Sequence, residues 1–206
     1  MSSLKFNLKI VCKIVRKVTR FITDIFNIPY NFLYLNFNGV RYGKNFTING
    51  HPYIINDGNI FVGNNVTVNS GKHLNPIGGS SECVLHTFKN GKIQIGDNVG
   101  LSNCAIISMS EIRIGDNCKI GGSVKIYDTD FHAIDYLKRR DFKTDIPCSK
   151  KISIGDDVFI GAGSTILKGV TIGNNSIIGA GSVVSKNIPS NQIWGGNPIK
   201  FIKELE

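Results

Sequence analysis

The residues best suited to chemistry lie together in residues 128–135, which read DTDFHAID. His132 stands near the middle of this segment, and an imidazole can accept or donate a proton near neutral pH. Asp128, Asp130 and Asp135 flank the histidine. Each of these carboxylates could orient the imidazole or bind a hydroxyl group of a substrate, and each could equally hold a turn of the chain. The segment is therefore the first candidate for a proton-transfer site.

Other reactive residue types do not form a second centre. The four histidines lack the paired spacing of a histidine-bound zinc site, so we expect no metal cofactor. The five cysteines are an odd count without a CxxC pair, which disfavours a zinc ribbon or a disulfide framework. We expect small buried thiols in a reducing compartment. A covalent cysteine mechanism would need a base partner that the sequence does not specify. The histidines are His51, His73, His86 and His132, and the cysteines are Cys12, Cys83, Cys104, Cys118 and Cys148.

A repeat of six residues sets the elements that must position His132. Large aliphatic residues recur at this interval, and a glycine often follows, as in IGDNVG, IGDDVF and IGAGSV. A period of six fits no α-helix, whose aliphatic residues recur every three or four positions. It fits a short strand followed by a tight turn, and three units close a triangular coil. Residues 38–190 are therefore expected to form about six stacked coils, a prism filled with aliphatic side chains. The clearest series is Ile154, Ile160, Ile166, Ile172, Ile178 and Val184.

Two interruptions of the repeat must leave the prism as loops. The first is expected between Leu74 and Ile93 and contains His86. The second covers residues 127–151 and contains His132. A long loop that interrupts a strict repeat usually carries function. Arg139, with a second arginine beside it, could fold this loop back, contact an anionic part of a substrate, or stay solvated.

The two ends of the chain fall outside the repeat. Residues 1–37 are expected to form a basic amphipathic helix and a linker, because apolar residues recur at helical spacing over residues 4–26, with Lys and Arg on the other face. This helix could lie on an anionic membrane surface, or it could pack its apolar stripe under the assembled protein. Residues 191–206 are expected to form a C-terminal segment and a short helix that begins near Pro198.

The charge balance limits the partners. The 206 residues include 24 Lys and Arg against 15 Asp and Glu, a formal net charge of +9. We expect no nucleic-acid partner, because the basic residues concentrate in the two terminal segments and no recognition motif is present. No stretch reaches the roughly 18 apolar residues of a membrane span, and the N-terminus lacks the order of a secretion signal. The expected location is the cytoplasm, with the inner face of the membrane as the alternative.

Taken together, these features resemble the hexapeptide-repeat acyltransferases. The hexads, the DTDFH segment and the ending IGAGSVVSKNIPSNQIWGGNPIKFIK carry the resemblance over about residues 38–203. It is strongest to sugar O-acetyltransferases, such as the maltose and galactoside acetyltransferases and the enzymes that modify capsular or exopolysaccharide sugars. The resemblance implies an all-β, left-handed parallel β-helix that assembles as a homotrimer with active sites between neighbouring prisms. It implies acetyl-CoA-dependent O-acetylation of a sugar in surface polysaccharide biosynthesis.

The resemblance also assigns roles to individual residues. His132 matches the family's general base, which deprotonates the acceptor hydroxyl as it attacks the thioester directly. Acetyl-CoA is expected along the last coils, where small residues admit the pantetheine arm and cationic side chains meet the phosphates. Lys200 and Lys203 stand where relatives commonly have Arg, and a solvated helix face is the alternative for both. Trp194 could stack on the adenine or cover the end of the prism. The full cofactor-binding set is Ala162, Ala180, Ser185, Lys186, Trp194, Lys200 and Lys203.

The acceptor side is less fixed by the resemblance. Leu101 stands where the family has a polar Asn, which puts maltose or galactoside specificity in doubt. Ser102 and Asn103 are nearby polar candidates, with ordinary turn roles as the alternative. His86 could line the same cleft or have no role. The predicted substrate-binding set is Asp128, Asp130, Ser102, Asn103, His86 and Arg139. The sequence does not specify the acceptor sugar, the hydroxyl or the acyl chain length.

Three other functions compete with this expectation. N-acetylation of an amino sugar or a nucleotide-sugar would use the same base and groove. A metal-dependent lyase resembling the γ-class carbonic anhydrases would need histidines from two protomers around a zinc ion. A non-catalytic β-helix scaffold would have no reason for the DTDFH loop or for a coenzyme-type ending.

Overall fold

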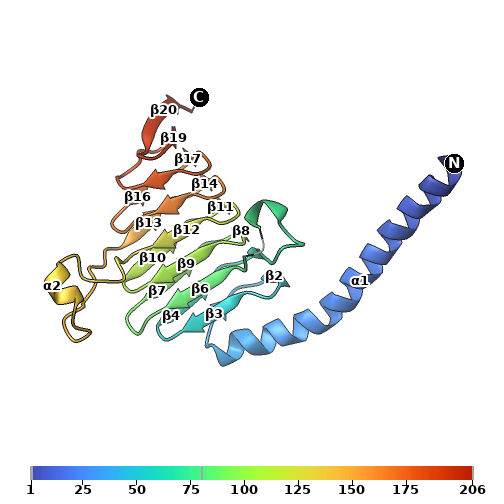
Figure 1. The fold of residues 1–206 in the computed structure, drawn as a ribbon, viewed down its shortest axis with the longest axis horizontal. Helices are drawn as coiled ribbons and strands as arrows, with labels where there is room; N and C mark the ends of the chain where they lie inside the picture. The colour runs from blue at the N-terminus through green and yellow to red at the C-terminus, as the bar shows by residue number, and fades with distance from the viewer. Residues whose placement is uncertain (1, 80, 206) are drawn as a thin grey trace.

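The chain winds so that its strands fall onto three sheets (Figure 1). The computed structural model describes residues 2–79 and 81–205, without the side chains of residues 2–7, 16 and 20–24. The first sheet holds β1 (Arg41–Tyr42), β4 (Asn59–Val62), β7 (Lys92–Ile95), β10 (Glu111–Ile114), β13 (Ile152–Ile154) and β16 (Thr171–Ile172). The second holds β2 (Thr47–Gly50), β5 (Thr67–Ser70), β8 (Gly100–Ser102), β11 (Lys119–Ile120), β14 (Phe159–Ile160), β17 (Ile177–Ile178), β19 (Gln192–Gly195) and β20 (Lys200–Glu204). The third holds β3 (Tyr53–Asn56), β6 (Val84–Thr87), β9 (Ala105–Ser108), β12 (Lys125–Tyr127), β15 (Thr165–Ile166) and β18 (Val183–Val184).

Each coil contributes one strand to each sheet, and the first and third sheets have six strands each. The three-sheet, six-coil architecture confirms the predicted left-handed parallel β-helix. Neighbouring coils are in the register that the repeat predicts, because each aliphatic residue of the late coils pairs with its counterpart one coil later. The pairs are Ile154–Ile172, Ile160–Ile178 and Ile166–Val184.

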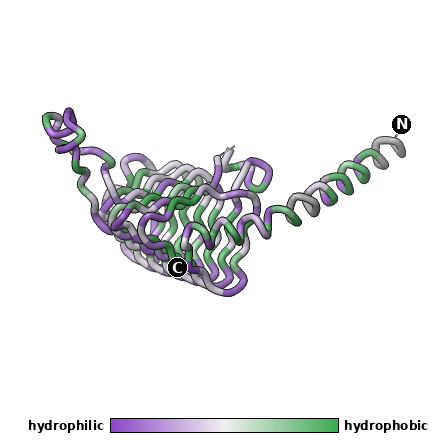
Figure 2. The backbone as a smooth tube through the Cα atoms, turned by 90° about the horizontal axis from the view of Figure 1, so that it is seen from below, coloured by the Kyte–Doolittle hydropathy of each residue, from purple (hydrophilic) through white to green (hydrophobic). Residues whose placement is uncertain are grey.

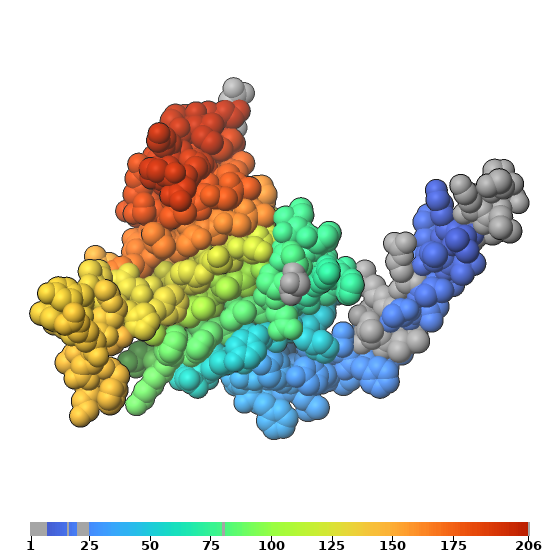
Figure 3. All heavy atoms as spheres, viewed as in Figure 1, coloured from blue at the N-terminus to red at the C-terminus, as the bar shows by residue number. Residues whose placement is uncertain are grey.

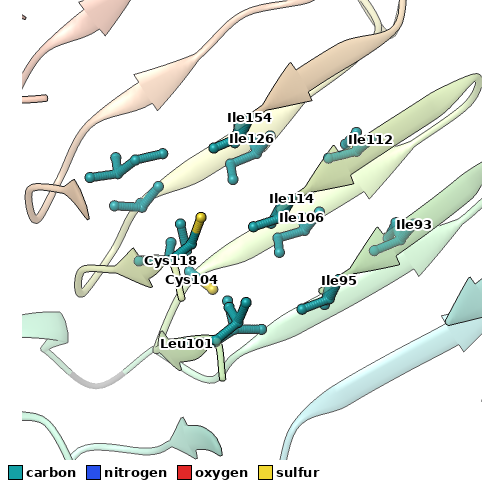
Figure 4. Packing of buried hydrophobic residues seen from close by; sticks show 14 of the residues in the cluster. Ile93, Ile95, Leu101, Cys104, Ile106, Ile112, Ile114, Cys118, Ile126 and Ile154 are labelled. Carbon is teal, nitrogen blue, oxygen red and sulfur yellow. The ribbon is translucent and has the colours of Figure 1, made fainter. Parts of the chain in front are cut away.

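The inward-facing residues form columns along the prism (Figure 4). Ile93 pairs with Ile112, and Ile95 pairs with Ile114, so that like side chains stack on each other from coil to coil. Cys104 and Cys118 lie among these aliphatic residues and are fully buried, which confirms their expected packing role. Two other cysteines, Cys12 and Cys148, are exposed, contrary to the expectation for the cysteines as a group. The columns keep the coils in register and fix where each loop leaves.

One corner of the prism is held by stacked asparagines. Asn65, Asn98 and Asn117 all have positive φ angles, of 55°, 58° and 59°. Asparagine tolerates this left-handed conformation better than most residues. Each side-chain amide donates to the oxygen of the next, at 3.1 Å from Asn65 to Asn98 and at 3.0 Å from Asn98 to Asn117. The turn residues of the hexads therefore also link neighbouring coils.

The two interruptions leave the prism at different places. The second runs from the end of β12 to the start of β13, close to the predicted bounds, and it carries a short helix that was not predicted, α2 (Tyr136–Arg139) (Figure 1). The first is shorter than predicted, because β6 begins at Val84 and Leu85 fills an inward position. It includes a short 3₁₀ helix, Pro76–Gly78. His86 therefore lies on a strand of the third sheet, and its predicted place in the loop was wrong.

At the N-terminus, α1 (Ser2–Phe37) confirms the predicted helix and is longer than the periodic stretch indicated. Pro29 lies inside it. At the C-terminus the predicted short helix was wrong. Residues 200–204 form β20, which pairs antiparallel with β19 and thereby covers the edge of the second sheet. The physical reason is that the unpaired edge of β19 offers backbone hydrogen bonds to a chain reversed at Gly196, where φ is 97°.

Truncation of one core residue is expected to test the columns directly. Ile112→Ala should lower the free energy of unfolding by about 2–5 kcal/mol, because Ile112 has no exposed surface and the prism can close little of the cavity left behind. Chemical denaturation measures the change. Arg113→Ala, on the outward face of the same strand, should stay within about 0.5 kcal/mol of the parent. Equal losses in both variants would contradict the packing described.

Candidate active site

The loop that carries His132 is held by hydrogen bonds where it joins the prism. It leaves the third sheet after Tyr127 and returns at Ile152. The backbone amide of Lys150 donates to the carbonyl of Asp128 at 2.8 Å, and the amide of Asp130 donates to the carbonyl of Cys148 at 3.1 Å. The two arms of the loop are therefore tied together next to the prism, and the segment between them projects outward (Figure 1).

Asp128 lies at this junction of loop and prism and is not exposed on the surface. Its side chain has no exposed area. Its carboxylate accepts hydrogen bonds from the Ser108 hydroxyl at 2.7 Å and from the backbone amides of Met109 and Ser110 at 2.7 and 2.9 Å. These contacts use the carboxylate to hold the preceding coil's turn. The structure therefore places Asp128 where it cannot meet a substrate, contrary to its prediction as a substrate-binding residue.

This placement gives a stability prediction. Asp128→Ala is expected to lower the free energy of unfolding by about 2–4 kcal/mol, because it leaves two amides and one hydroxyl without their acceptor. Asp57→Ala, which removes an exposed carboxylate, is the matched control and should change stability by less than about 0.5 kcal/mol. Denaturation of both variants decides the matter. A parent-like stability for Asp128→Ala would contradict the structural role.

His132 is held by a carboxylate from the other arm of the loop. Its Nδ1 lies 2.6 Å from Oδ2 of Asp145, and Oδ1 of Asp145 accepts from the backbone amide of Ala133 at 2.6 Å. The hydrogen bond from His132 and that from Ala133 hold the pKa of Asp145 below its usual range. Because an ionised carboxylate only accepts, Nδ1 carries a proton and the neutral imidazole leaves Nε2 as the acceptor. The His132 side chain is 66% exposed, so Nε2 is open to a substrate.

Asp145 was not among the carboxylates that the sequence singled out. The prediction considered Asp128, Asp130 and Asp135, which flank His132, whereas Asp145 is thirteen residues further along the chain. The loop must fold back before the two meet, and no local spacing signals this. The flanking residues have other partners: Asp130 pairs with Lys168 at 2.6 Å, and Asp135 accepts from the amide of Leu137 at the start of α2.

Arg139 maintains the folded-back conformation of the loop. Its Nη1 donates to the carbonyls of Ala133 and Ile134, at 2.8 and 3.3 Å. This is the first of the alternatives that the sequence left open for Arg139. Because Ala133 also donates to Asp145, Arg139 and Asp145 grip the same backbone segment directly after His132. The structure thus does not place Arg139 as a free cation for a substrate.

The residues predicted to contact the acceptor are not all accessible in the structure. Asn103 is buried, and its side chain bonds Gly71 and Asn75, so that it ties down the first interruption. Ser102 is half-buried on the second sheet. His86 lies on the outer face of the third sheet, where it stacks on Phe88 with ring centroids 4.4 Å apart.

His86 nevertheless shares an outward-facing row with Tyr127, the last strand residue before the His132 loop. In the parallel register of the third sheet, His86 pairs with Ile107, which pairs with Tyr127. The Tyr127 ring contacts Phe131 edge to face at 5.4 Å, directly before His132. Burial raises the pKa of Tyr127. The outward row Ile55, His86, Ile107 and Tyr127 therefore leads along the sheet to the loop.

The predicted coenzyme residues gather at the last coils. Lys186 Nζ lies 5.1 Å from the centre of the Trp194 ring, and Trp194 packs edge to face on Phe201. Ser185, Lys200 and Lys203 are exposed in the same end of the chain, the two lysines on β20. Ala162 and Ala180 lie at the corner that follows β14 and β17, where the amide of Gly179, next to Ala180, donates to the carbonyl of Trp194 at 2.8 Å.

That corner has room beside the backbone. Gly181, next to Ala180, has a positive φ of 70°, and an added Cβ there would meet no atom within 4 Å. A narrow, unbranched chain can therefore approach this corner closely, and the exposed cations at the last coils can bind phosphates. These residues fit the pantetheine arm and the phosphates of coenzyme A.

The thiols do not offer a competing nucleophile in the core. Burial raises the pKa of Cys118 to about 11, and a hydrogen bond with Cys83, followed by burial, raises that of Cys104 well above its usual range. A thiol is a good nucleophile only as its thiolate. In the part of the chain that the structure describes, no three His, Cys, Asp or Glu residues gather closely enough to hold a metal ion. Two surface hollows, one at Lys72 and His73 and one at Arg41 and Lys92, include none of the residues around His132.

Comparison with known proteins gives consistent matches. Residues 151–186 match the family model for the bacterial transferase hexapeptide, six repeats. An inferred acetyltransferase of Dictyostelium discoideum is 43% identical over 114 residues, which is 55% of this chain and 58% of that protein. The structure of a maltose O-acetyltransferase from Clostridium difficile is 32% identical, with a TM-score of 0.53 over 81% of this chain and 70% of that chain.

A hexapeptide-repeat acetyltransferase of Vibrio cholerae, solved in complex with acetyl coenzyme A, is 33% identical. The match covers 59% of this chain and 64% of that one, with a TM-score of 0.51. The chain spans little more than half the length of the curated relatives from Dictyostelium discoideum and Saccharomyces cerevisiae, 58% and 56%.

Proposed function

The chain belongs to the hexapeptide-repeat acetyltransferases, and from that premise we propose that it transfers the acetyl group of acetyl-CoA to a hydroxyl group of a sugar. The observation that carries the proposal is the pair of His132 and Asp145, with Nδ1 held at 2.6 Å and the imidazole largely exposed. An imidazole oriented by a carboxylate is the arrangement that general-base catalysis requires. The pair lies on the loop that interrupts the repeat, where nothing in the prism needs it.

The residues act in the following order in this proposal. Acetyl-CoA supplies an activated acetyl group as a thioester. Nε2 of His132 takes the proton of the acceptor hydroxyl as its oxygen bonds to the thioester carbonyl carbon. Asp145 stabilises the imidazolium that forms, because its carboxylate is already bonded to Nδ1. The carbon–sulfur bond then breaks, and the imidazolium returns the proton to the leaving thiolate, which restores the neutral imidazole.

Coenzyme binding is proposed at the last coils. Lys186, Lys200 and Lys203 would meet the phosphates, and the corner at Ala162 and Ala180 would admit the pantetheine arm. This corner and the His132 loop lie at opposite ends of the strands of the third sheet. The corner comes before the start of β15, whereas the loop follows the end of β12. One prism alone therefore does not bring the two sets together. We accordingly propose a homotrimer in which neighbouring protomers complete each site.

The acceptor is proposed to be a sugar of a surface polysaccharide, acetylated in the cytoplasm. The Clostridium difficile neighbour acts on maltose, according to its name, which supports a sugar. The outward row of His86, Ile107 and Tyr127 offers an aromatic and imidazole surface that leads to His132. Ser102 and Asp130, both half-buried, remain predicted acceptor contacts.

Thiol release from acetyl-CoA tests the proposal. The purified protein is assayed with a panel of free sugars, amino sugars, nucleotide-sugars and polysaccharide fragments, and mass spectrometry locates the new acetyl group. An acetyl ester on a sugar hydroxyl is the expected product. An amide on an amino sugar would replace O-acetylation by the N-acetylation alternative. Calorimetry with coenzyme A is run on the same sample, and an absence of both binding and thiol release would support a scaffold instead.

A further inference from the structure

Among the described side chains of α1, those that hydrogen-bond to the prism lie in its last turns. The Asn31 side chain donates to the carbonyl of Gly50 at 2.9 Å, and the Tyr34 hydroxyl exchanges hydrogen bonds with the backbone of Ile54. Leu35 is buried against the core. These three residues lie on one face of the helix, at spacings of three and four. The rest of α1 extends away from the prism (Figure 3).

A second face of α1 carries a continuous apolar stripe. The stripe consists of Leu8, Val11, Val15, Val18 and Ile25, which share one side of a helix with about 3.6 residues per turn. These residues are between 51% and 67% exposed. The stripe continues into Phe32 and Leu33, which are 58% and 54% exposed beside the buried Asn31 and Leu35. The stripe is thus opposite the face that contacts the prism, so the prism cannot cover it.

The third feature is the charge of the face opposite the stripe, which is the side of the helix that carries Asn31 and Leu35 near its end. Lys9, Lys13 and Lys17 are exposed there. The sequence of α1 holds six Lys and Arg and a single acidic residue, Asp24, so nearly all of the basic residues lack an acidic residue within the helix to pair with. Hydrophobic and hydrophilic segments alternate along α1 in Figure 2. A helix with one apolar side and one basic side fits a surface that has negative headgroups above a hydrocarbon layer.

The width of the apolar face distinguishes a lipid surface from a second copy of the helix. A coiled coil buries a narrow seam and places charged residues beside it. Here the positions beside the stripe include Ile14, Phe26 and Ile28, which are 54%, 70% and 67% exposed. The apolar face therefore takes up close to half of the helix circumference. In the described part of the chain, no helix is long and apolar enough to cross a membrane.

We propose that residues 8–33 of α1 bind along an anionic lipid surface, with the apolar stripe in the hydrocarbon boundary and the lysines at the headgroups. The prism then stands on the side of the helix that faces away from the lipid. This arrangement follows from the opposite faces of Asn31 and Leu35 on one hand and Phe32 and Leu33 on the other. The proposal does not depend on the acetyl transfer proposed above.

Flotation of the full-length protein with vesicles tests this inference. Vesicles of phosphatidylcholine alone are compared with vesicles of phosphatidylcholine mixed with phosphatidylglycerol. The protein should float with the mixed vesicles, less with phosphatidylcholine alone, and less at high salt. Val15→Asp should lower the bound fraction about tenfold, because it places a charge in the stripe. Asn27→Asp adds the same charge on the face that carries Lys9 and should keep most of the binding.

Reversing the charge of the lysines measures the electrostatic contribution to vesicle binding. The triple variant Lys9→Glu, Lys13→Glu and Lys17→Glu should lose the preference for phosphatidylglycerol. Circular dichroism and thermal melting show whether each variant still folds, and light scattering gives the oligomeric state. Failure of the parent protein to float with mixed vesicles would overturn the proposal. So would equal binding by Val15→Asp and the parent. A parent that does not float, together with a Val15→Asp variant that changes the oligomeric state, would assign the stripe to contacts between copies.

Discussion

Replacement of His132 by alanine is expected to lower kcat by roughly 10²- to 10⁴-fold, the usual contribution of a general base. The variant removes the Nε2 atom that would take the hydroxyl proton. It removes little packing, because the side chain is 66% exposed and its Nδ1 contact is with Asp145. The thermal unfolding temperature should therefore stay close to that of the parent. Steady-state thiol release and thermal melting on the same preparations measure both quantities.

Ile134→Ala is the matched control for this variant. Ile134 lies two residues from His132 on the same loop, and its side chain is 74% exposed. Its truncation should leave kcat within about twofold, because it takes no acid–base group from the loop. A large loss in both variants would mean that the loop as a whole, and not the imidazole, supports turnover. Parent-like activity of His132→Ala would remove the general base from the proposal.

The prism could be predicted from the sequence because its physical cause is local and repeated. Each hexad places an aliphatic residue inward and a turn residue at a corner, and pairs such as Ile160 and Ile178 then follow at fixed register. The extent of the second loop could be predicted for the same reason, since Tyr127 and Ile152 bound a stretch without the repeat. Where the repeat is strict, the fold has few alternatives.

Irregular segments were predicted less well. The break in the repeat indicates a loop at Val84, yet Leu85 fills the inward position and His86 joins the third sheet. Residues 200–204 were expected to be helical, yet they complete the edge of β19. In both cases pairing with a neighbouring strand decided the conformation, and a short window of sequence does not reveal that partner.

The candidate site shows the same limit at the level of single residues. His132 was found because its segment stands out from the repeat. Asp128, four residues earlier, carried the same signal and is a buried structural carboxylate. Asp145 carried no signal and holds the imidazole. Residue type and proximity in sequence therefore located the loop, whereas the folded loop determined which carboxylate has which role.

Asp145→Asn is expected to have the second large effect, a fall in kcat of roughly 10²- to 10⁴-fold. The asparagine amide can present its NH₂ group to Nδ1, which favours the tautomer with a proton on Nε2, and that tautomer cannot accept the hydroxyl proton. The KM for acetyl-CoA should change little, because Asp145 is not among the predicted coenzyme residues. Asp141→Asn is the matched control: it makes the same charge change on the same loop, and asparagine can still accept from the amide of Lys143.

The pH dependence of kcat shows whether Asp145 acts by positioning the imidazole of His132 or only by ordering the loop. The hydrogen bond from His132 and that from Ala133 hold the pKa of Asp145 below its usual range. A group with a lowered pKa in the folded state stays ionised until the pH falls through that lowered value. The ionised carboxylate that binds His132 is therefore fully present above the ordinary aspartate pKa of about 4 and is lost only at a lower pH. Loss of activity between about pH 5 and 7 in the parent therefore cannot come from protonation of Asp145. If Asp145→Asn and Asp141→Asn lower kcat equally, or if Asp145→Asn raises only KM, Asp145 merely orders the loop. A selective fall in kcat at every pH above about 5 instead assigns it to positioning the imidazole.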